Sequence, residues 1–229
     1  TGGGLEITLT ANNSVIAAID LGGRNAQVVA EAGTVKVEAK ETARFSSNVA
    51  NVSTAIAPIG LAVGAAVMST RHLSTVKAMV KDARVTGRTV LVTAEADVDI
   101  TEVRGTGVSV GTVAITVNES TAQAHGTVLA EIDNAALVGQ LSVDVIAQAN
   151  LFVRASTIGV SAGLGAIGTM LAYAEAGREG INDAQVVLRN NADLRGGLVN
   201  LQARAVSDVF ARTTVGGGGG LAAVGAVSN

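Results

Sequence analysis

Val90-Leu91-Val92-Thr93-Ala94 is one copy of a short alternating segment that recurs through the chain. Further copies are Val35-Lys36-Val37-Glu38-Ala39, Val143-Asp144-Val145-Ile146-Ala147 and Leu198-Val199-Asn200-Leu201-Gln202-Ala203. The alanines that close them, at positions 39, 94, 147 and 203, differ by 55, 53 and 56 residues. A fifth copy, Leu5 to Ala11, closes 28 residues before the next, which is about half a period. Self-similarity at a fixed period predicts a repeat architecture.

Two glycine-containing features share this period. A hinge of small residues between hydrophobic ones contains Gly64, Gly111, Gly168 and Gly225, and spans 62–67, 109–113, 166–170 and 223–227. A turn is expected before the alternating segments, at Gly87, Gly139 and Gly196-Gly197. Each unit then has the order turn, alternating strand, polar stretch, hinge, alternating strand and turn.

The hydrophobic periodicity favours strands over helices. Val90, Val92 and Ala94 alternate with Leu91 and Thr93, which is the period of a β-strand. Thr and Val are abundant, and β-branched side chains favour strands. The 28 glycines would repeatedly interrupt helices. Some segments, such as 76–84 and 134–149, are also compatible with short helices.

The composition predicts a thin core built by stacking. Hydrophobic residues make up 48% of the 229 residues, but aromatic residues only 2%, and Trp does not occur. We therefore expect an all-β parallel β-solenoid of about four imperfect units of about 55 residues, each forming two to three rungs. Residues 1–229 are expected to be one continuous segment cut from a longer repetitive polypeptide. A β-sandwich is the alternative, although it usually contains a few core aromatic residues.

The repeat texture resembles the leukotoxin-type giant filamentous adhesins of Gram-negative bacteria. The residues that carry this resemblance are 34–39, 62–67, 216–229 and their copies, which together extend over nearly the whole chain. The resemblance implies a repetitive protein that is exported to the cell surface or secreted. It also implies a role in adhesion or cell–cell contact, and it implies no catalytic residue.

The chain carries only weak signatures of catalysis. Ser109 and Ser161 lie in Gly-x-Ser-x-Gly segments, which in serine hydrolases need a strand-to-helix turn and a nearby His and acid. Two such matches are expected in a chain rich in Gly, Val and Ser. The histidines, His72 and His125, are interpreted as surface or corner residues that could stack on neighbouring rungs. The dispersed carboxylates are interpreted as a solvated face: Asp97, Asp99, Glu102, Asp133, Asp144, Glu175, Glu179 and Asp183.

Cofactor and metal signatures are equally weak. Asp20-Leu21-Gly22-Gly23 is a poor match to calcium-binding nonapeptides, and Gly216 to Gly220 lacks the Gly-Lys-Ser/Thr of a phosphate loop. Cys does not occur, so no thiolate site can form. The sequence therefore predicts no catalytic, cofactor-binding or metal-binding residues and no cofactor.

Charge limits the partners. The net charge of -3 provides no basic footprint for nucleic acid. The uncharged segments 49–70, 105–118 and 155–174 recur in every repeat, and walls of a sheet explain them better than membrane helices. Membrane insertion is therefore not expected. The expected partners are neighbouring repeats of the same polypeptide, a laterally associated copy or a surface or host receptor.

Three functions follow from these features. The main prediction is a structural or adhesive element outside the cell or at its surface, a rigid rod that acts in adhesion, cell–cell contact or filament assembly without catalysis. The reason is that no polar feature is concentrated in one repeat and missing from the others. The alternatives are a carbohydrate-acting β-helix enzyme and a membrane-active toxin segment. A row of arginines, including Arg71, Arg104 and Arg154, could provide a lateral contact.

Overall fold

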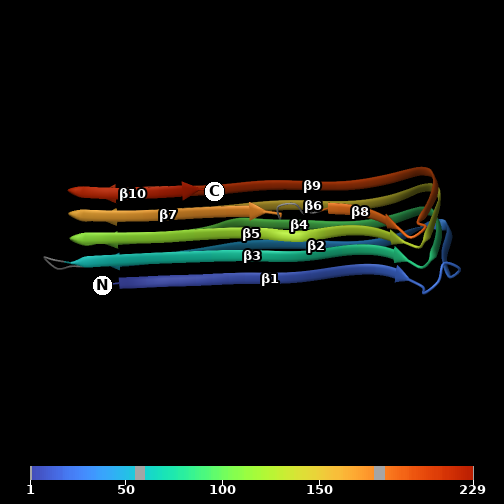
Figure 1. Ribbon diagram of the computed structural model, residues 1–229, viewed down its shortest axis with the longest axis horizontal. Coiled ribbons are helices and arrows are strands. Elements are labelled where there is room, and N and C mark those ends of the chain that lie inside the picture. The colour runs from blue at the N-terminus through green and yellow to red at the C-terminus, as the bar shows by residue number, and fades with distance from the viewer. Residues whose placement is uncertain (1, 55–59, 178–183, 229) are drawn as a thin grey trace.

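The protein is an all-β parallel solenoid whose strands are unusually long. The structure, a computed structural model, describes residues 2–54, 60–177 and 184–228, and these contain no helix. The strands lie side by side along the long axis of the molecule (Figure 1). Their bounds are β1 (Gly2–Asp20), β2 (Gln27–Thr54), β3 (Leu61–Lys81), β4 (Arg84–Val110), β5 (Val113–Asp133), β6 (Ala136–Ala162), β7 (Gly165–Ala176), β8 (Ala184–Arg189), β9 (Asp193–Gly218) and β10 (Leu221–Ser228).

Two parallel sheets face each other. One sheet has the order β1-β3-β5-β7-β10, with β8 also paired to β5, and the other has the order β2-β4-β6-β9. We call one circuit of the chain, with one strand in each sheet, a rung. The strand β2 has 28 residues, so a rung is about 90 Å wide at a rise of about 3.3 Å per residue.

Each repeat unit forms one rung, so the expectation of two to three rungs per unit is wrong. Val35 pairs with Val90, Val90 with Val143, and Val143 with Val199, which advances the chain by one repeat at each step. The half-period copy Leu5 to Ala11 lies on β1 and pairs with β3, with Leu5 opposite Ala66. It therefore belongs to the sheet that faces β2, β4, β6 and β9. The half period is therefore the step from one sheet to the facing sheet within a single rung.

The corners that follow β3, β5 and β8 are sharp and polar. Asp82, Asn134 and Asn190 all have a φ of 46°, in the left-handed region that Asp and Asn tolerate better than most residues. The amide of Asn134 donates to Asp82 Oδ1 over 2.6 Å. Short polar side chains thus stabilise the corners and link successive rungs. We call this end of the molecule the polar end.

The glycines that the sequence assigned to turns and hinges occupy other positions in the fold. Gly87 and Gly139 pair in register inside β4 and β6, next to register shifts, so they lie at irregularities within continuous strands. Gly111 lies in a corner rather than in a hinge. Gly64 and Gly168 flank Thr116 in one column of β3, β5 and β7, which places the hinge inside the sheet.

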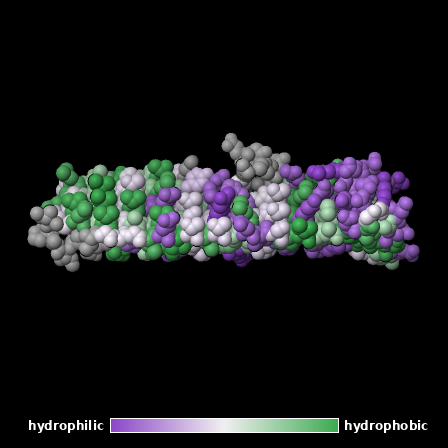
Figure 2. All heavy atoms as spheres, turned by 60° about the horizontal axis from the view of Figure 1, so that its bottom comes forward, coloured by the Kyte–Doolittle hydropathy of each residue, from purple (hydrophilic) through white to green (hydrophobic). Residues whose placement is uncertain are grey.

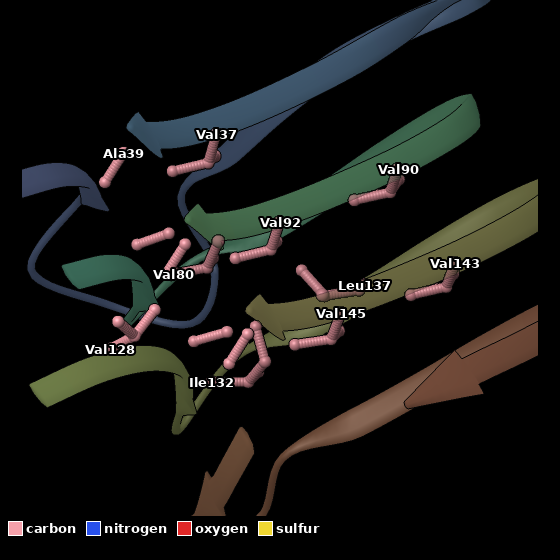
Figure 3. Packing of buried hydrophobic residues seen from close by; sticks show 14 of the residues in the cluster. Val37, Ala39, Val80, Val90, Val92, Val128, Ile132, Leu137, Val143 and Val145 are labelled. Atoms are coloured by element: carbon pink, nitrogen blue, oxygen red, sulfur yellow. The ribbon is translucent and has the colours of Figure 1, made fainter. Parts of the chain in front are cut away.

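A core of small aliphatic side chains fills the half near the polar end. The columns predicted from the repeat are present: Val92 pairs with Val145, and Ala94 with Ala147, and all four are fully buried. Figure 3 shows these valines packing against side chains from the facing sheet. Stacking like on like lets this thin interior form without aromatic residues.

The opposite end of the molecule has the reverse polarity. We call it the uncharged end, and it consists of residues 2–5, 49–54, 60–70, 105–118, 155–174 and 213–228. Its interior holds buried polar side chains, such as Ser109, Thr116 and Asn118, beside the buried Met68 and Met170, whereas other apolar side chains point outward. Figure 2 shows the hydrophobic surface gathered at this end and the hydrophilic surface at the other.

The polar interior of the uncharged end joins the two sheets. Asn118 Nδ2 donates to the carbonyl oxygen of Ile158 over 2.8 Å, and Thr157 Oγ1 donates to that of Leu171 over 2.7 Å. The interior is so narrow that an added Cβ at Gly107 would lie 2.2 Å from Asn118 Oδ1. Glycine in one sheet therefore makes room for the polar side chain of the other.

The recurring uncharged segments are sheet walls, as the sequence predicted. Residues 105–110 belong to β4 and residues 113–118 to β5, and the equivalent segments of the next repeat belong to β6 and β7. None of the described residues belongs to a helix that could cross a membrane.

Candidate functional site

A buried polar cluster interrupts the aliphatic interior between β2 and β3. Glu41 on β2 is 4% exposed and faces His72 and Ser74 on β3, which are 0% and 7% exposed. The side chains alternate between the two faces of each strand, and all three residues occupy the inward phase. Figure 1 shows β2 and β3 in facing sheets, so the cluster spans the interior.

Glu41 is the centre of this cluster. Its Oε1 lies 3.1 Å from His72 Nε2 and accepts a hydrogen bond from Asn13 Nδ2 over 2.7 Å. Its Oε2 accepts a hydrogen bond from Ser74 Oγ. The ring of Phe45 packs against His72 with 5.0 Å between ring centroids. The carboxylate thus has three donors, which is how buried charge is usually accommodated.

The cluster occurs in one rung only. Glu41 shares its column with Ala96, Ala149 and Ala205, and His72 lies between Ala11 and Ala124. The expectation that no polar feature is concentrated in one repeat is therefore wrong. The signal was present in the sequence, because Glu41 falls in the same alternating phase as Val35, Val37 and Ala39, which are buried.

A second polar group lies on the outer face of the sheet that contains β3, β5 and β7. Glu175 Oε2 accepts hydrogen bonds from Tyr173 over 2.9 Å and from Gln123 over 3.0 Å, and His125 Nε2 lies 3.8 Å away. The hydrogen bond to the Glu175 carboxylate raises the pKa of the Tyr173 phenol above its ordinary value. Arg71 lies in the same column as Gln123 and Glu175.

A surface hollow of about 670 Å³ connects the two groups. Arg71, His125 and Glu175 line it from the outer group, and Asn13 and Ser74 line it from the buried cluster. These side chains offer donors and one carboxylate to a small polar ligand. Glycoside hydrolysis uses two carboxylates across the scissile bond, and the described lining contains only Glu175.

The two histidines do not stack on each other. His72 pairs in register with Ala124, and His125 with Leu73, so the two rings point to opposite faces of the sheet. His72 is completely buried, which contradicts its interpretation as a surface or corner residue. His125 Nδ1 lies 2.6 Å from the carbonyl oxygen of Gly177, so this nitrogen carries the proton.

The serines of the Gly-x-Ser-x-Gly segments serve the interior. Ser109 and Ser161 pair in register and are fully buried in the uncharged end. Ser109 Oγ donates to the carbonyl oxygen of Ile115 over 2.8 Å. Ser161 Oγ lies 3.0 Å from the carbonyl oxygen of Ile167. No histidine or carboxylate is among their hydrogen-bond partners in the described residues.

Ser74 is also not arranged as a nucleophile. In a catalytic triad the histidine lies between the serine and the acid, whereas here Glu41 binds both Ser74 and His72. His72 Nδ1 is buried and has no hydrogen-bond partner among the described residues. The arrangement suits a structural polar contact between the sheets.

The other acids form no metal-binding cluster in the described residues. Asp97 and Asp99 both point outward from β4 and are partly exposed, which agrees with a shared face. In the described part of the chain, no three His, Asp or Glu side chains gather to hold a metal ion. Glu179 and Asp183 lie outside the described residues.

Comparison with known proteins finds no family model, no curated protein and no solved structure that matches this chain.

Proposed function

We propose that this chain is a structural, adhesive element of a large bacterial cell-surface or secreted protein, and that its function is assembly and contact without catalysis. The observation that supports this most is the in-register stacking of like residues in successive rungs, as in the column Val35, Val90, Val143 and Val199. The repeat texture that resembles leukotoxin-type filamentous adhesins supports the same function.

The outermost rung offers a surface for further stacking. Val199 and Leu201 on β9 continue the buried columns of Val143 and Val145, yet they are 40% and 46% exposed. The backbone of β9 pairs with β6 on one side only. An edge strand with exposed apolar side chains is a template for another strand.

A further rung would complete these columns. It would come from a neighbouring repeat of the same polypeptide or from a second copy of the chain. Each added rung extends the stack by about 4.8 Å, whereas its width stays near 90 Å. A few rungs therefore form a broad slab, and the rod that the sequence suggested requires a tall stack.

Assembly through this edge is testable with substitutions on β9. Val199→Lys with Leu201→Lys places two charges in the columns that a new rung must cover, and Gln202→Lys, on the outward phase, is the matched control. Sedimentation velocity over a range of concentrations measures self-association. Beads coated with each protein measure adhesion as clumping.

We expect the unmodified chain and the Gln202→Lys control to form species larger than a dimer as the concentration rises and to clump beads strongly, and the edge variant to stop at a dimer or below and to clump beads less. A chain that stays monomeric at every concentration would contradict the proposal. Release of reducing ends from a panel of polysaccharides would instead favour the carbohydrate-acting alternative.

A further inference from the structure

The outer face of the uncharged end carries a flat apolar patch on the sheet of β1, β3, β5, β7 and β10. Its most exposed side chains are between 40% and 79% exposed, and they are Leu61, Val113, Val117, Ile167 and Leu221. Glu6 and Glu119 are the first charged residues along β1 and β5 at its inner boundary. Figure 2 shows that apolar side chains dominate this end of the molecule.

The outer face of this end is apolar where a solvated sheet would be polar, although its interior also buries Met68 and Met170. Ser120 and Asn118 are buried, whereas Val117 on the same strand is 43% exposed. In the other half, Val90 and Val92 are buried and the partly exposed Asp97 and Asp99 face outward. Water covers the outer face of that half. The exposed apolar side chains of the uncharged end indicate that another apolar surface covers them.

Lipid does not suit this surface. The strands β9 and β10 form one edge of the uncharged end and β1 and β2 form the other, and each of these strands pairs with a neighbour on one side only. Their unpaired backbone groups would lie in hydrocarbon if this end entered a bilayer, at a cost of several kcal/mol for each group. Packed against a protein sheet, the same edges remain at a solvated rim.

We propose that this patch packs face to face against the same patch of a second copy, which gives a lateral contact between slabs. The patch spans three outward columns on β3, β5, β7 and β10, with Gly2 and Gly4 of β1 at its margin, about 20 Å by about 24 Å, or about 500 Å². A two-fold contact would bury about 1,000 Å² in total, which is at the lower limit for a specific interface. Flat sheets with β-branched side chains pack in this way about 10 Å apart.

The patch is a different surface from the row of arginines that the sequence suggested for a lateral contact. Of these arginines, Arg104 lies 4.0 Å from Glu102 and Arg154 lies 3.9 Å from Asp208, in ion pairs within the chain. The arginine contact stays a separate prediction. The inference rests on the proposed assembly function and names a second surface for it, separate from the β9 edge.

The test uses the chain with its edge already blocked by Val199→Lys and Leu201→Lys. In that background, Val117→Lys with Ile167→Lys places two charges in the patch. Ile16→Lys is the matched control, since Ile16 is 62% exposed and lies beside Lys77 near the polar end. Light scattering after gel filtration and sedimentation equilibrium measure the dimer.

We expect the edge-blocked chain and the Ile16 control to dimerise, and the patch variant to dissociate with a Kd at least about tenfold higher. Because the chain has no Cys, Val117→Cys can be tested with a short bismaleimide and should form cross-linked dimers, whereas Ile16→Cys should not. An edge-blocked chain that is monomeric, or one that floats with phosphatidylcholine vesicles, would overturn the proposal. If Val199→Lys with Leu201→Lys leaves association beyond the dimer unchanged, the β9 edge is not the stacking surface, whereas the patch contact still stands. The two surfaces are therefore tested separately.

Discussion

Truncation of one valine column should show that stability depends on a neighbour in the rung above and the rung below. Val143 is fully buried between Val90 and Val199, whereas Val199 lies on the edge rung and is 40% exposed. Val143→Ala and Val199→Ala are the same chemical change in the same column. Only the number of covering rungs differs.

The expected costs follow from burial. Losing two buried methylene equivalents from Val143 costs about 1.6 kcal/mol of transfer free energy, and the cavity left in a closed column adds about 1 kcal/mol. For Val199 about three-fifths of the side chain is covered, so we expect about 1 kcal/mol and little cavity cost. The difference between the two variants is then about 1.5 kcal/mol.

Guanidinium unfolding followed by circular dichroism measures both variants against the unmodified chain at low protein concentration, where copies do not stack. The free energy of unfolding should fall more for Val143→Ala than for Val199→Ala. Equal costs, or a larger cost at Val199, would refute the stacked columns as the source of stability.

Two further predictions concern the polar groups. Tyr173 is the only tyrosine, and its raised pKa stabilises the folded state at pH values below the ordinary tyrosine pKa, a contribution lost as pH rises through the raised value. Glu175→Gln should bring the midpoint of tyrosinate absorbance down towards the ordinary value, and an unchanged midpoint would contradict the hydrogen bond as its cause. Glu41→Leu and His72→Leu should each cost about 2–4 kcal/mol, because each strands a buried polar partner. The double variant should cost clearly less than the two added together in the same unfolding assay, and additive costs would argue against direct coupling.

The repeat columns could be predicted because they depend on local sequence. Alternation of Val90, Val92 and Ala94 specifies a strand, and recurrence of the same residues specifies what stacks on it. Parallel pairing in register followed from these two facts. The buried cluster was also within reach, since Glu41 and His72 occupy the inward phase of their strands.

The rung length could not be predicted, because a repeat fixes the period and not the number of chain reversals within it. Gly87 was interpreted as a turn but lies within β4, whereas the real corner forms at Asp82. A glycine at a strand irregularity and an Asp or Asn at a left-handed corner produce similar breaks in the hydrophobic pattern. Only the pairing of whole strands distinguishes them.

The sequence by itself determined the strand, the period and the columns, because each of these arises from neighbours along the chain or from identical neighbours one repeat away. The tertiary structure alone decided which residues meet across the interior. These are Glu41 with His72, Gly107 with Asn118, and the other side chains in the polar interior of the uncharged end. Those contacts depend on how two facing sheets are offset, and that offset is set by the lengths of the corners and the packing of all rungs together.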